Sequence, residues 1–304
     1  MEPLDGKGLA QEIQARLKDE ILDLKARTGR VPGLAVVLVG ADPASRTYVK
    51  SKEKAAAELG IFSRVVRLGT DAGREELIAR IQELNRAKEV SGVLVQLPLP
   101  KKFPVWDILD HLDPAKDVDC FHPFNLGMVL LNRAHLFPCT PAGVMALIDH
   151  YKLDVTGMNA LVVGRSFIVG KPLFTMLSNR DATVTLCHSK TRDLGSLVKR
   201  ADLVVAAVGR PAVITADMIK DGAIVIDVGT NYLDKRDEVR QYCDESQQEK
   251  FEKKGYAYAG DIHYPAYDKA SFYTPVPGGV GPMTVAMLMQ NTVELFKKGL
   301  APGQ

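Results

Sequence analysis

A lysine falls on the apolar side of a predicted helix, where it could carry protons. The apolar spacing over 48–59 predicts this helix. A rotation of about 100° per residue places Lys52 on the same face as Ala56 and Leu59. Tyr48 falls one turn earlier on that face. Because burial disfavours the charged form of an amine, Lys52 is a candidate proton carrier near neutral pH. The alternative is a lysine that extends its amine along the helix into solvent.

Polar residues also accompany two other apolar segments of the first half. Gln96 lies in a strand predicted over 92–100, and Asp117 and Asp119 lie in a loop that enters an apolar segment. Open α/β sheets bind ligands at the carboxyl ends of their strands, and a buried amide needs a hydrogen-bond partner. These residues are therefore site candidates. The alternative is structural, with Gln96 bonded to backbone and Asp119 capping a helix.

The segment 275–282, PVPGGVGP, has an unusual composition. Six of its eight residues are glycine or proline. Such a composition fixes an irregular path and lets the backbone approach a ligand closely. The alternative is a rigid connecting loop.

A turn bracketed by glycines follows a strand predicted over 160–164. Gly164, Ser166 and Gly170 form the pattern G-x-S-x-x-x-G, and Pro172 suits the first turn of a following helix. A turn of this kind lets backbone N–H groups and a helix N-terminus approach a pyrophosphate. The alternative is a strand, turn and helix without a ligand.

The end of the next predicted strand, 183–189, favours NADP over NAD. It runs into HSKTR at 188–192, and the first carboxylate is Asp193. An NAD site usually carries an acidic residue about 20 positions after its glycine motif, to bind the ribose 2′-hydroxyl. Hydroxyls and cations suit a 2′-phosphate instead, and Arg165 in the turn adds a further cation. The sequence therefore predicts NADP.

Strands alternate with helices in both halves of the chain, which predicts parallel sheets with right-handed crossovers. The segment 234–254 differs, because 13 of its 21 residues are charged. This composition predicts a solvated helix or excursion, and the alternative is a binding surface. The expected helices span 9–27, 48–59, 74–87 and 285–297, and the expected strands span 33–40, 63–68, 92–100, 160–164, 183–189, 201–209 and 223–229.

The composition excludes several classes of protein. With 304 residues, 46% of them hydrophobic, the chain is long enough for two globular domains. Its 39 basic and 37 acidic residues give a net charge of +2, which predicts neither a nucleic-acid nor a membrane partner. The four cysteines and six histidines show no metal-ligand spacing, and the N-terminus lacks the apolar core of a signal peptide. We therefore expect a cytoplasmic protein without a metal.

Six strings resemble one enzyme family, in order and across nearly the whole chain: YVKSKEKAAAELGI, GVLVQLPLP, KDVDCFHPFNLG, PCTPAGV, VVGRSFIVGKP and TPVPGGVGPMTVAML. They are similar to the bifunctional methylenetetrahydrofolate dehydrogenase/methenyltetrahydrofolate cyclohydrolase family. The resemblance implies NADP-dependent oxidation of 5,10-methylenetetrahydrofolate to 5,10-methenyltetrahydrofolate, followed by hydrolysis to 10-formyltetrahydrofolate. It also implies a homodimer.

The resemblance further implies an α/β fold with two domains. Residues 1–139 plus 272–304 are expected to form an α/β folate domain completed by the C-terminal helix. Residues 140–271 are expected to form a Rossmann-like NADP domain with a doubly wound parallel sheet.

Residue roles follow from the matching motifs. Lys52 is similar to the family's catalytic lysine, Gln96 to the partner of that lysine, and Tyr48 to the tyrosine that packs on the folate. Asp119 resembles the acid that holds the pterin ring, and these four are the expected catalytic residues. The expected substrate-binding residues are Tyr48, Val49, Lys50, Ser51, Lys52, Val95, Gln96, Leu97, Asp119, Pro277, Gly278, Gly279, Val280 and Gly281. The expected cofactor-binding residues are Gly164, Arg165, Ser166, Ser189 and Thr230.

Three alternatives compete with this interpretation: an NADP-dependent dehydrogenase of another small substrate, a monofunctional folate dehydrogenase, and a binding protein without catalysis. The first explains the turn bracketed by glycines but not the lysine helix and the PVPGGVGP loop together. The intact Lys52 argues against the third. The sequence departs from the usual family pattern at Phe167, Cys120 and Thr230, and the charged segment 234–254 is longer than usual.

Overall fold

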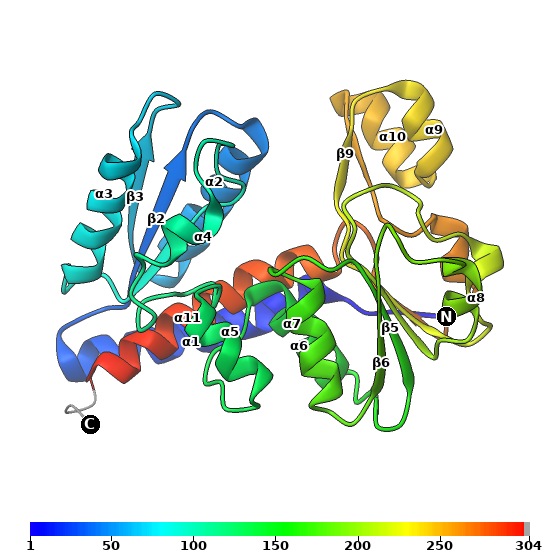
Figure 1. Ribbon diagram of the computed structural model, residues 1–304, viewed down its shortest axis with the longest axis horizontal. Coiled ribbons are helices and arrows are strands. Elements are labelled where there is room, and N and C mark those ends of the chain that lie inside the picture. The colour runs from blue at the N-terminus through cyan, green and yellow to red at the C-terminus, as the bar shows by residue number, and fades with distance from the viewer. Residues whose placement is uncertain (301–304) are drawn as a thin grey trace. The chain divides into compact units, whose positions relative to one another are not determined.

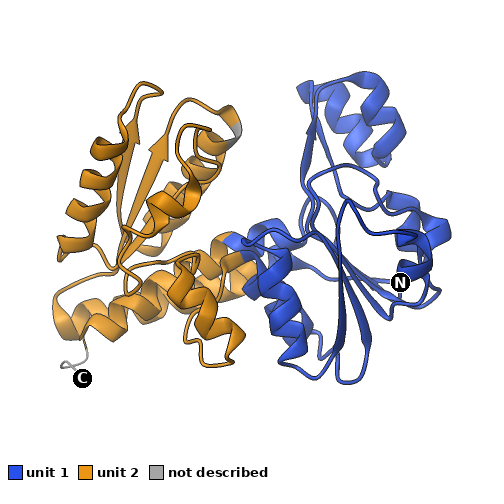
Figure 2. Ribbon diagram, viewed as in Figure 1, with its two compact units in different colours: residues 1–9, 140–284 blue, residues 10–139, 285–304 orange. Residues whose placement is uncertain are grey.

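The computed structural model describes residues 1–300 and contains two compact units (Figure 2). Unit 1 comprises residues 1–9 and 140–284, and unit 2 comprises residues 10–139 and 285–304. Residues 301–304, which fall in the expected folate domain, lie outside the described residues. The domain boundaries expected from the resemblance stay a prediction, because the units are defined by packing and not by what they bind.

Unit 2 is built on a parallel sheet with the strand order β3-β2-β4, and Figure 1 labels β2 and β3. Every residue of β2 is buried, as expected of an apolar central strand. The sheet continues beyond β4 through a parallel bridge between Val93 and Asp117, which brings the loop carrying Asp119 alongside β4. The strands are β2 (Gly33–Val39), β3 (Phe62–Leu68) and β4 (Gly92–Val95).

Strand β4 ends earlier than the sequence predicted. The N–H group of Gln96 still bonds to the carbonyl of Val37 at 2.9 Å. Pro98 and Pro100 then follow, and proline has no N–H to donate to a sheet. Gln96 therefore lies where the strand becomes a loop.

Helix α2 (Pro43–Leu59) carries the lysine singled out above. It begins five residues before the predicted start, because the carboxylate of Asp42 accepts the N–H of Ser45 at 2.7 Å and a proline occupies the first turn. Gly60 ends it in the left-handed conformation, with φ 76°. The other helices with residues in unit 2 are α1 (Gly6–Thr28), α3 (Arg74–Arg86), α4 (Val105–Leu109), α5 (Pro123–Leu130) and α11 (Val280–Leu300).

Unit 1 contains a six-stranded sheet with the order β1-β11-β8-β7-β5-β6, and all its pairings are parallel. Its strands are β1 (Glu2–Pro3), β5 (Asn159–Val163), β6 (Thr183–Cys187), β7 (Leu203–Ala206), β8 (Ile224–Asp227) and β11 (Phe272–Tyr273). The chain adds β6 on one side of β5 and then returns to add β7 on the other side. The fold is therefore a doubly wound parallel sheet, and its topological switch point lies between β5 and β7.

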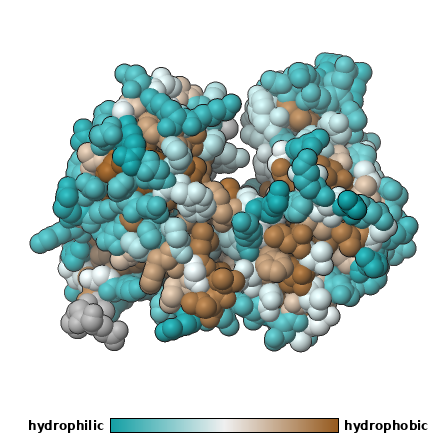
Figure 3. Space-filling view, viewed as in Figure 1, coloured by the Kyte–Doolittle hydropathy of each residue, from teal (hydrophilic) through white to brown (hydrophobic). Residues whose placement is uncertain are grey.

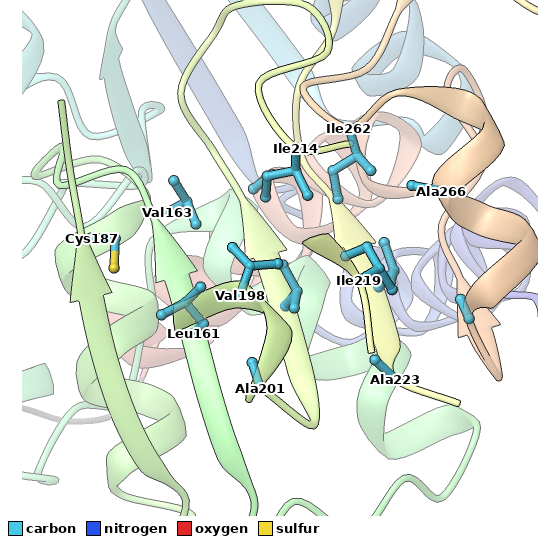
Figure 4. Close-up of a cluster of buried hydrophobic side chains, with 14 residues drawn as sticks. Leu161, Val163, Cys187, Val198, Ala201, Ile214, Ile219, Ala223, Ile262 and Ala266 are labelled. Atoms are coloured by element: carbon cyan, nitrogen blue, oxygen red, sulfur yellow. The ribbon is translucent and has the colours of Figure 1, made fainter. Parts of the chain in front are cut away.

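Helices and short turns enclose the core of unit 1. Helix α7 packs against β5 and β6. On the sheet, Leu161 and Val163 of β5 join Ile214 and Ile262 from two loops in one buried cluster (Figure 4). The helices with residues in this unit also include α6 (Cys139–His150), α7 (Gly170–Ser178) and α8 (Leu194–Lys199), with 3-10 turns at Ala216–Met218 and Tyr264–Lys269.

The charged segment 234–254 forms two helices, α9 (Arg236–Tyr242) and α10 (Glu245–Lys254). They pack on an antiparallel pair of strands, β9 (Asn231–Leu233) and β10 (Ala257–Ala259). A small core of their own stabilises this excursion, and it includes Leu233, Val239 and Cys243.

The surface carries both hydrophilic and hydrophobic residues. Apolar side chains gather over α5 (Figure 3), where Phe124 and Leu130 are exposed. Within residues 1–300, no helix combines the length and the apolar character needed to cross a bilayer.

Candidate functional site

The amine of Lys52 is held at the carboxyl end of β4. Its Nζ donates to Oε1 of Gln96 at 3.0 Å, and the lysine is half-buried. Gln96 is only 8% exposed, and its Nε2 donates to the carbonyl of Leu97 at 2.7 Å. This second bond fixes which end of the amide faces the lysine. The sheet therefore presents an oriented acceptor to the amine.

Asp119 completes this arrangement in unit 2. Burial raises the pKa of the Asp119 carboxyl, while the nearby charge of Lys52 and a hydrogen bond from Cys139 act to lower it. The Sγ of Cys139 lies 3.3 Å from Oδ1 of Asp119. The structure thus places the side chains of Lys52, Gln96 and Asp119 near one another at the carboxyl end of β4.

Two supporting residues were not found from the sequence. Cys139 contacts Asp119 as described, and Asn291 of α11 fixes the chain just before that acid. The Nδ2 of Asn291 donates to the carbonyls of Val118 at 2.9 Å and Phe137 at 3.0 Å. The available signal was an amide within the apolar run of the last helix, because a buried amide requires partners.

The other expected folate residues of unit 2 differ in exposure. Tyr48 is 52% exposed, one turn before Lys52 on α2, so its ring is available to a ligand. Val49 and Val95 are buried in the core, which leaves only their backbone for a substrate. Lys50 and Ser51 are exposed.

The proline- and glycine-rich segment lies in unit 1 and leads into α11. The N–H of Gly279 donates to the carbonyl of Pro275 at 2.8 Å, and a Cβ at Gly279 would lie 2.6 Å from that of Thr274. Gly278 has φ +121°, a conformation that side chains rarely adopt. Close packing therefore requires glycine at position 279 and the backbone conformation favours it at 278, while Pro277 is exposed. Gly281 is also exposed, and Val280 is buried.

The turn bracketed by glycines lies at the switch point of the unit 1 sheet. Gly164 has φ +126°, and any Cβ there would overlap the carbonyl oxygen of Ala207, after β7. The Oγ of Ser166 accepts the N–H groups of Val169 at 3.2 Å and Gly170 at 3.3 Å, at the start of α7. This tight turn, leading into a helix N-terminus at the carboxyl edge of a sheet, fits a pyrophosphate.

The remaining cofactor candidates follow neighbouring strands. After β6, the N–H of His188 donates to Oγ1 of Thr191 at 2.8 Å and closes a turn that leaves Ser189 exposed. Arg165 is exposed after β5, and Thr230 is exposed after β8. These hydroxyls and cations fit the phosphates of a dinucleotide.

Comparisons with known proteins decide the family. Two protein-family models match the chain. The one described as tetrahydrofolate dehydrogenase/cyclohydrolase, catalytic domain, matches residues 4–119, and the one for the NAD(P)-binding domain of the same family matches residues 138–300. The chain belongs to the tetrahydrofolate dehydrogenase/cyclohydrolase family. It is therefore a bifunctional enzyme, a methylenetetrahydrofolate dehydrogenase and a methenyltetrahydrofolate cyclohydrolase that uses a nicotinamide dinucleotide. The predictions of family, fold class and enzyme class are confirmed.

Three similar proteins cover the chain almost completely. The Bifunctional protein FolD of a Nitratiruptor species is 46% identical over 299 residues, which is 98% of this chain and 99% of the relative. The crystal structure of the bifunctional enzyme FolD from Campylobacter jejuni is 45% identical, with a TM-score of 0.89, and the match covers 99% of this chain and 100% of that one. The FolD of Trypanosoma brucei, solved with NADP cofactor and an inhibitor, is 37% identical, with a TM-score of 0.89 and 98% coverage of both chains.

Proposed function

We propose that Lys52 carries the proton transfers of the cyclohydrolase reaction and that Gln96 and Asp119 orient it and the folate. The observation that supports this assignment most directly is the 3.0 Å hydrogen bond from the half-buried Lys52 amine to Gln96. An amine with a fixed acceptor beside it is held in one place, and positioning is what general acid–base catalysis requires.

The cyclohydrolase reaction needs two proton movements. Water attacks the cationic carbon of 5,10-methenyltetrahydrofolate, and ring opening gives 10-formyltetrahydrofolate. The attacking water must lose both of its protons: the solvent takes one as the C=O bond forms, and the other passes to the departing ring nitrogen. Lys52 takes and returns this proton, a contribution of about a hundred- to ten-thousand-fold.

The dehydrogenase reaction makes different demands on the chain. NADP⁺, when bound, accepts a hydride from the methylene carbon of the folate. No side chain has to move a proton in this step, so the protein binds and aligns the reactants. The half-exposed ring of Tyr48 packs on the folate, the carboxylate of Asp119 accepts hydrogen bonds from the pterin, and the segment 277–281 contacts the folate through its backbone.

The proposed cofactor is NADP in preference to NAD, held by Gly164, Arg165, Ser166, Ser189 and Thr230. Two observations support it: the first carboxylate after β6 comes only after HSKTR at 188–192, and the relative from Trypanosoma brucei was solved with NADP. The Michaelis constants of the dehydrogenase for NADP⁺ and NAD⁺ test the choice. We expect a clearly lower value for NADP⁺, and a preference for NAD⁺ would contradict the proposal.

The proposed assembly is a homodimer in the cytoplasm. The family resemblance supports the dimer, while the four unpaired cysteines and the near-neutral charge are compatible with a reducing compartment. Light scattering on the purified protein should give a mass about twice the 33.2 kDa of the chain. A mass of one chain at micromolar concentration would show that the dimer is wrong.

Replacing the lysine separates the two activities. Lys52→Met removes the proton carrier and keeps the length of the side chain, so we expect cyclohydrolase turnover to fall at least about a hundredfold. The dehydrogenase, followed at 340 nm with methylenetetrahydrofolate and NADP⁺, should be reduced far less.

Lys54→Met is the matched control. Lys54 lies on the exposed side of the same helix and contacts only Glu58 among the ion pairs of the described residues. We expect both activities of this variant to match the wild type. Unchanged cyclohydrolase turnover in Lys52→Met would remove Lys52 from the proposed role.

A further inference from the structure

Unit 1 contains two buried carboxylates next to the loops that carry the proposed dinucleotide site. The proposed reaction uses neither of them. Asp261 is 0% exposed and Asp227 is 1% exposed. Asp227 is the last residue of β8, and Asp261 follows β10. Because a buried carboxylate is tolerated only with hydrogen-bond partners, its partners show what it holds in place.

The carboxylate of Asp261 binds one turn after β7. Its Oδ2 accepts the N–H groups of Val208 at 2.6 Å and Gly209 at 3.0 Å, and its Oδ1 accepts that of Arg210 at 3.0 Å. Successive backbone N–H groups that converge on an anion form a nest, a shape that often binds phosphate. Here the buried carboxylate of Asp261 occupies the nest, so its hydrogen bonds fix the conformation of the turn.

Asn231 connects the end of β8 to the same carboxylate. Its Nδ2 donates to Oδ1 of Asp261 at 2.9 Å and to the carbonyl of Ala259 at 3.2 Å. Asn231 directly follows Thr230, the proposed cofactor contact after β8. One carboxylate therefore joins the ends of two adjacent strands of the sheet.

Asp261 is itself fixed by its surroundings. Asp227 accepts the N–H groups of Asp261 at 2.9 Å and Ile262 at 2.8 Å, and the hydroxyl of Tyr267 at 3.0 Å. The carbonyl of Asp261 accepts the N–H of Val213 at 2.7 Å. Ile262 is buried in the core cluster of Figure 4. The backbone that presents the Asp261 carboxylate is thus anchored on both sides.

The turn that Asp261 holds lies at the switch point and is followed by a strained residue, Ala212. Gly209 and Ala212 have φ +66° and +53°, and such a conformation at a residue other than glycine persists only where its surroundings impose it. The N–H of Ala207 donates to the carbonyl of Val163, at the end of β5, at 2.7 Å. The carbonyl of Ala207 packs against Gly164. A shift of this turn would therefore alter the β7 side of the crevice where a dinucleotide binds.

We propose that Asp261 is a positioning residue for the dinucleotide. Its carboxylate fixes the turn 208–210 and, through Asn231, the backbone at Thr230, in the arrangement that binds NADP. The inference rests on the proposed function, which places the cofactor at the carboxyl edge of the unit 1 sheet. Asp261 is fully buried and acts through the backbone that it holds.

Asp261→Asn tests this role with little change in volume. One carboxylate oxygen becomes an NH₂ group that faces backbone N–H donors, so two of the four hydrogen bonds are lost. We expect the dissociation constant for NADPH, measured by fluorescence titration, to rise at least tenfold. Amide hydrogen exchange of residues 208–210 in the protein without ligand should accelerate. Cyclohydrolase kcat and KM should stay within twofold of the wild type.

Asp202→Asn is the matched control for loss of a carboxylate in the same sheet. Asp202 accepts the N–H of Asn159 at 3.0 Å, at the amino end of β5, and pairs with Lys220. This variant should unfold at a lower temperature and bind NADPH like the wild type. Asn231→Ala is a milder second test, because it leaves the three backbone bonds of Asp261 intact. It should raise the dissociation constant about two- to fivefold.

The outcomes separate this role from a merely structural one. If Asp261→Asn folds and binds NADPH like the wild type, the inference is wrong. If that variant does not fold, an unchanged dissociation constant in Asn231→Ala overturns the inference. A wild-type enzyme that binds NADH and not NADPH would contradict the proposed cofactor, and the same ratios measured with NADH would then decide the role of Asp261.

Discussion

The acid proposed to bind folate in unit 2 and two buried acids of unit 1 are used in different ways. In unit 2, Asp119 is only partly buried, and its contacts are the thiol of Cys139 and the charge of Lys52. In unit 1, Asp227 and Asp261 are fully buried and accept several backbone N–H groups each. A carboxylate that still has lone pairs to offer can bind a substrate, whereas one whose lone pairs are all engaged organises the chain around it.

The same contrast extends to recognition. Unit 2 presents the side chains of Lys52 on α2 and of Gln96 directly after β4, so single substitutions there should change chemistry more than stability. Unit 1 presents the backbone of turns such as the one at Gly164, so substitutions there should change affinity and stability together. Matched substitutions in the two units test this difference.

Gly164→Ala should have the largest effect. An added Cβ would overlap the carbonyl oxygen of Ala207, and φ +126° is strained for any side chain. The backbone at the switch point must then move, and we expect a loss of stability of about 2–4 kcal/mol together with NADPH affinity reduced at least a hundredfold. Chemical denaturation and fluorescence titration measure the two effects.

Gly157→Ala is the control for backbone strain alone. Gly157 has φ +70°, but a Cβ there meets nothing within 4 Å. We expect a cost of about 1 kcal/mol and unchanged NADPH affinity. If Gly164→Ala also kept its NADPH affinity, the close approach of the chain after β5 to the chain after β7 would not matter for the cofactor. The claim that substitutions in unit 1 change affinity and stability together would then be wrong.

Asp119→Ala tests the other side of the comparison. Removing the carboxylate leaves pterin donors unpaired at about 1–3 kcal/mol, so folate affinity should fall roughly five- to 150-fold. Stability should change little, because the variant also removes a carboxylate whose burial is unfavourable. Titration with the folate substrate measures the affinity.

Asp117→Asn provides the contrast within the same loop. Asp117 is buried and accepts the N–H of His122 at 2.8 Å and the amide of Asn125 at 2.9 Å. This variant should lose stability and keep its folate affinity. If Asp117→Asn instead lost folate affinity and Asp119→Ala lost stability, Asp117 would be the folate-binding acid and Asp119 the structural one.

The fold was predictable because its signals are local. Alternating apolar strands and amphipathic helices recur along the chain, and the three strands of the unit 2 sheet and four of the six strands of the unit 1 sheet follow from them. The two-residue strands β1 and β11 were not predicted. The error at the start of α2 was avoidable, because Asp42 followed by Pro43 is a recognisable helix start.

The residues that were missed depend on contacts distant in sequence. Asn291 reaches carbonyls more than 150 residues away, and Asp261 reaches the turn at 208–210 about 50 residues away. No spacing in the sequence encodes such pairs. Lys52 was found because its charge contradicts the apolar face around it, whereas Asp261 lies in a loop where an acid is unremarkable.

The smallest predicted effect is a pH dependence that separates the two kinds of acid. Burial and the neighbouring charge of Asp261 raise the pKa of Asp227 to about 7, from an ordinary value of 3.8. The folded protein then binds a proton that the unfolded chain has released, so this residue's contribution to stability declines as pH rises from about 4 through 7. Asp227→Asn cannot release this proton.

The free energy of unfolding of wild type and Asp227→Asn, measured in urea at pH 6 and pH 8, isolates this residue from the other carboxylates. The variant should be less stable at both values, because both oxygens of the carboxyl group accept backbone N–H groups, of Asp261 and Ile262, whereas an NH₂ group accepts neither. Its deficit should be about 1 kcal/mol smaller at pH 8, because only the wild type loses stability across this interval. An equal deficit at both pH values would mean that Asp227 is already ionised at pH 6, and its saturated hydrogen bonds would then outweigh the cost of its burial.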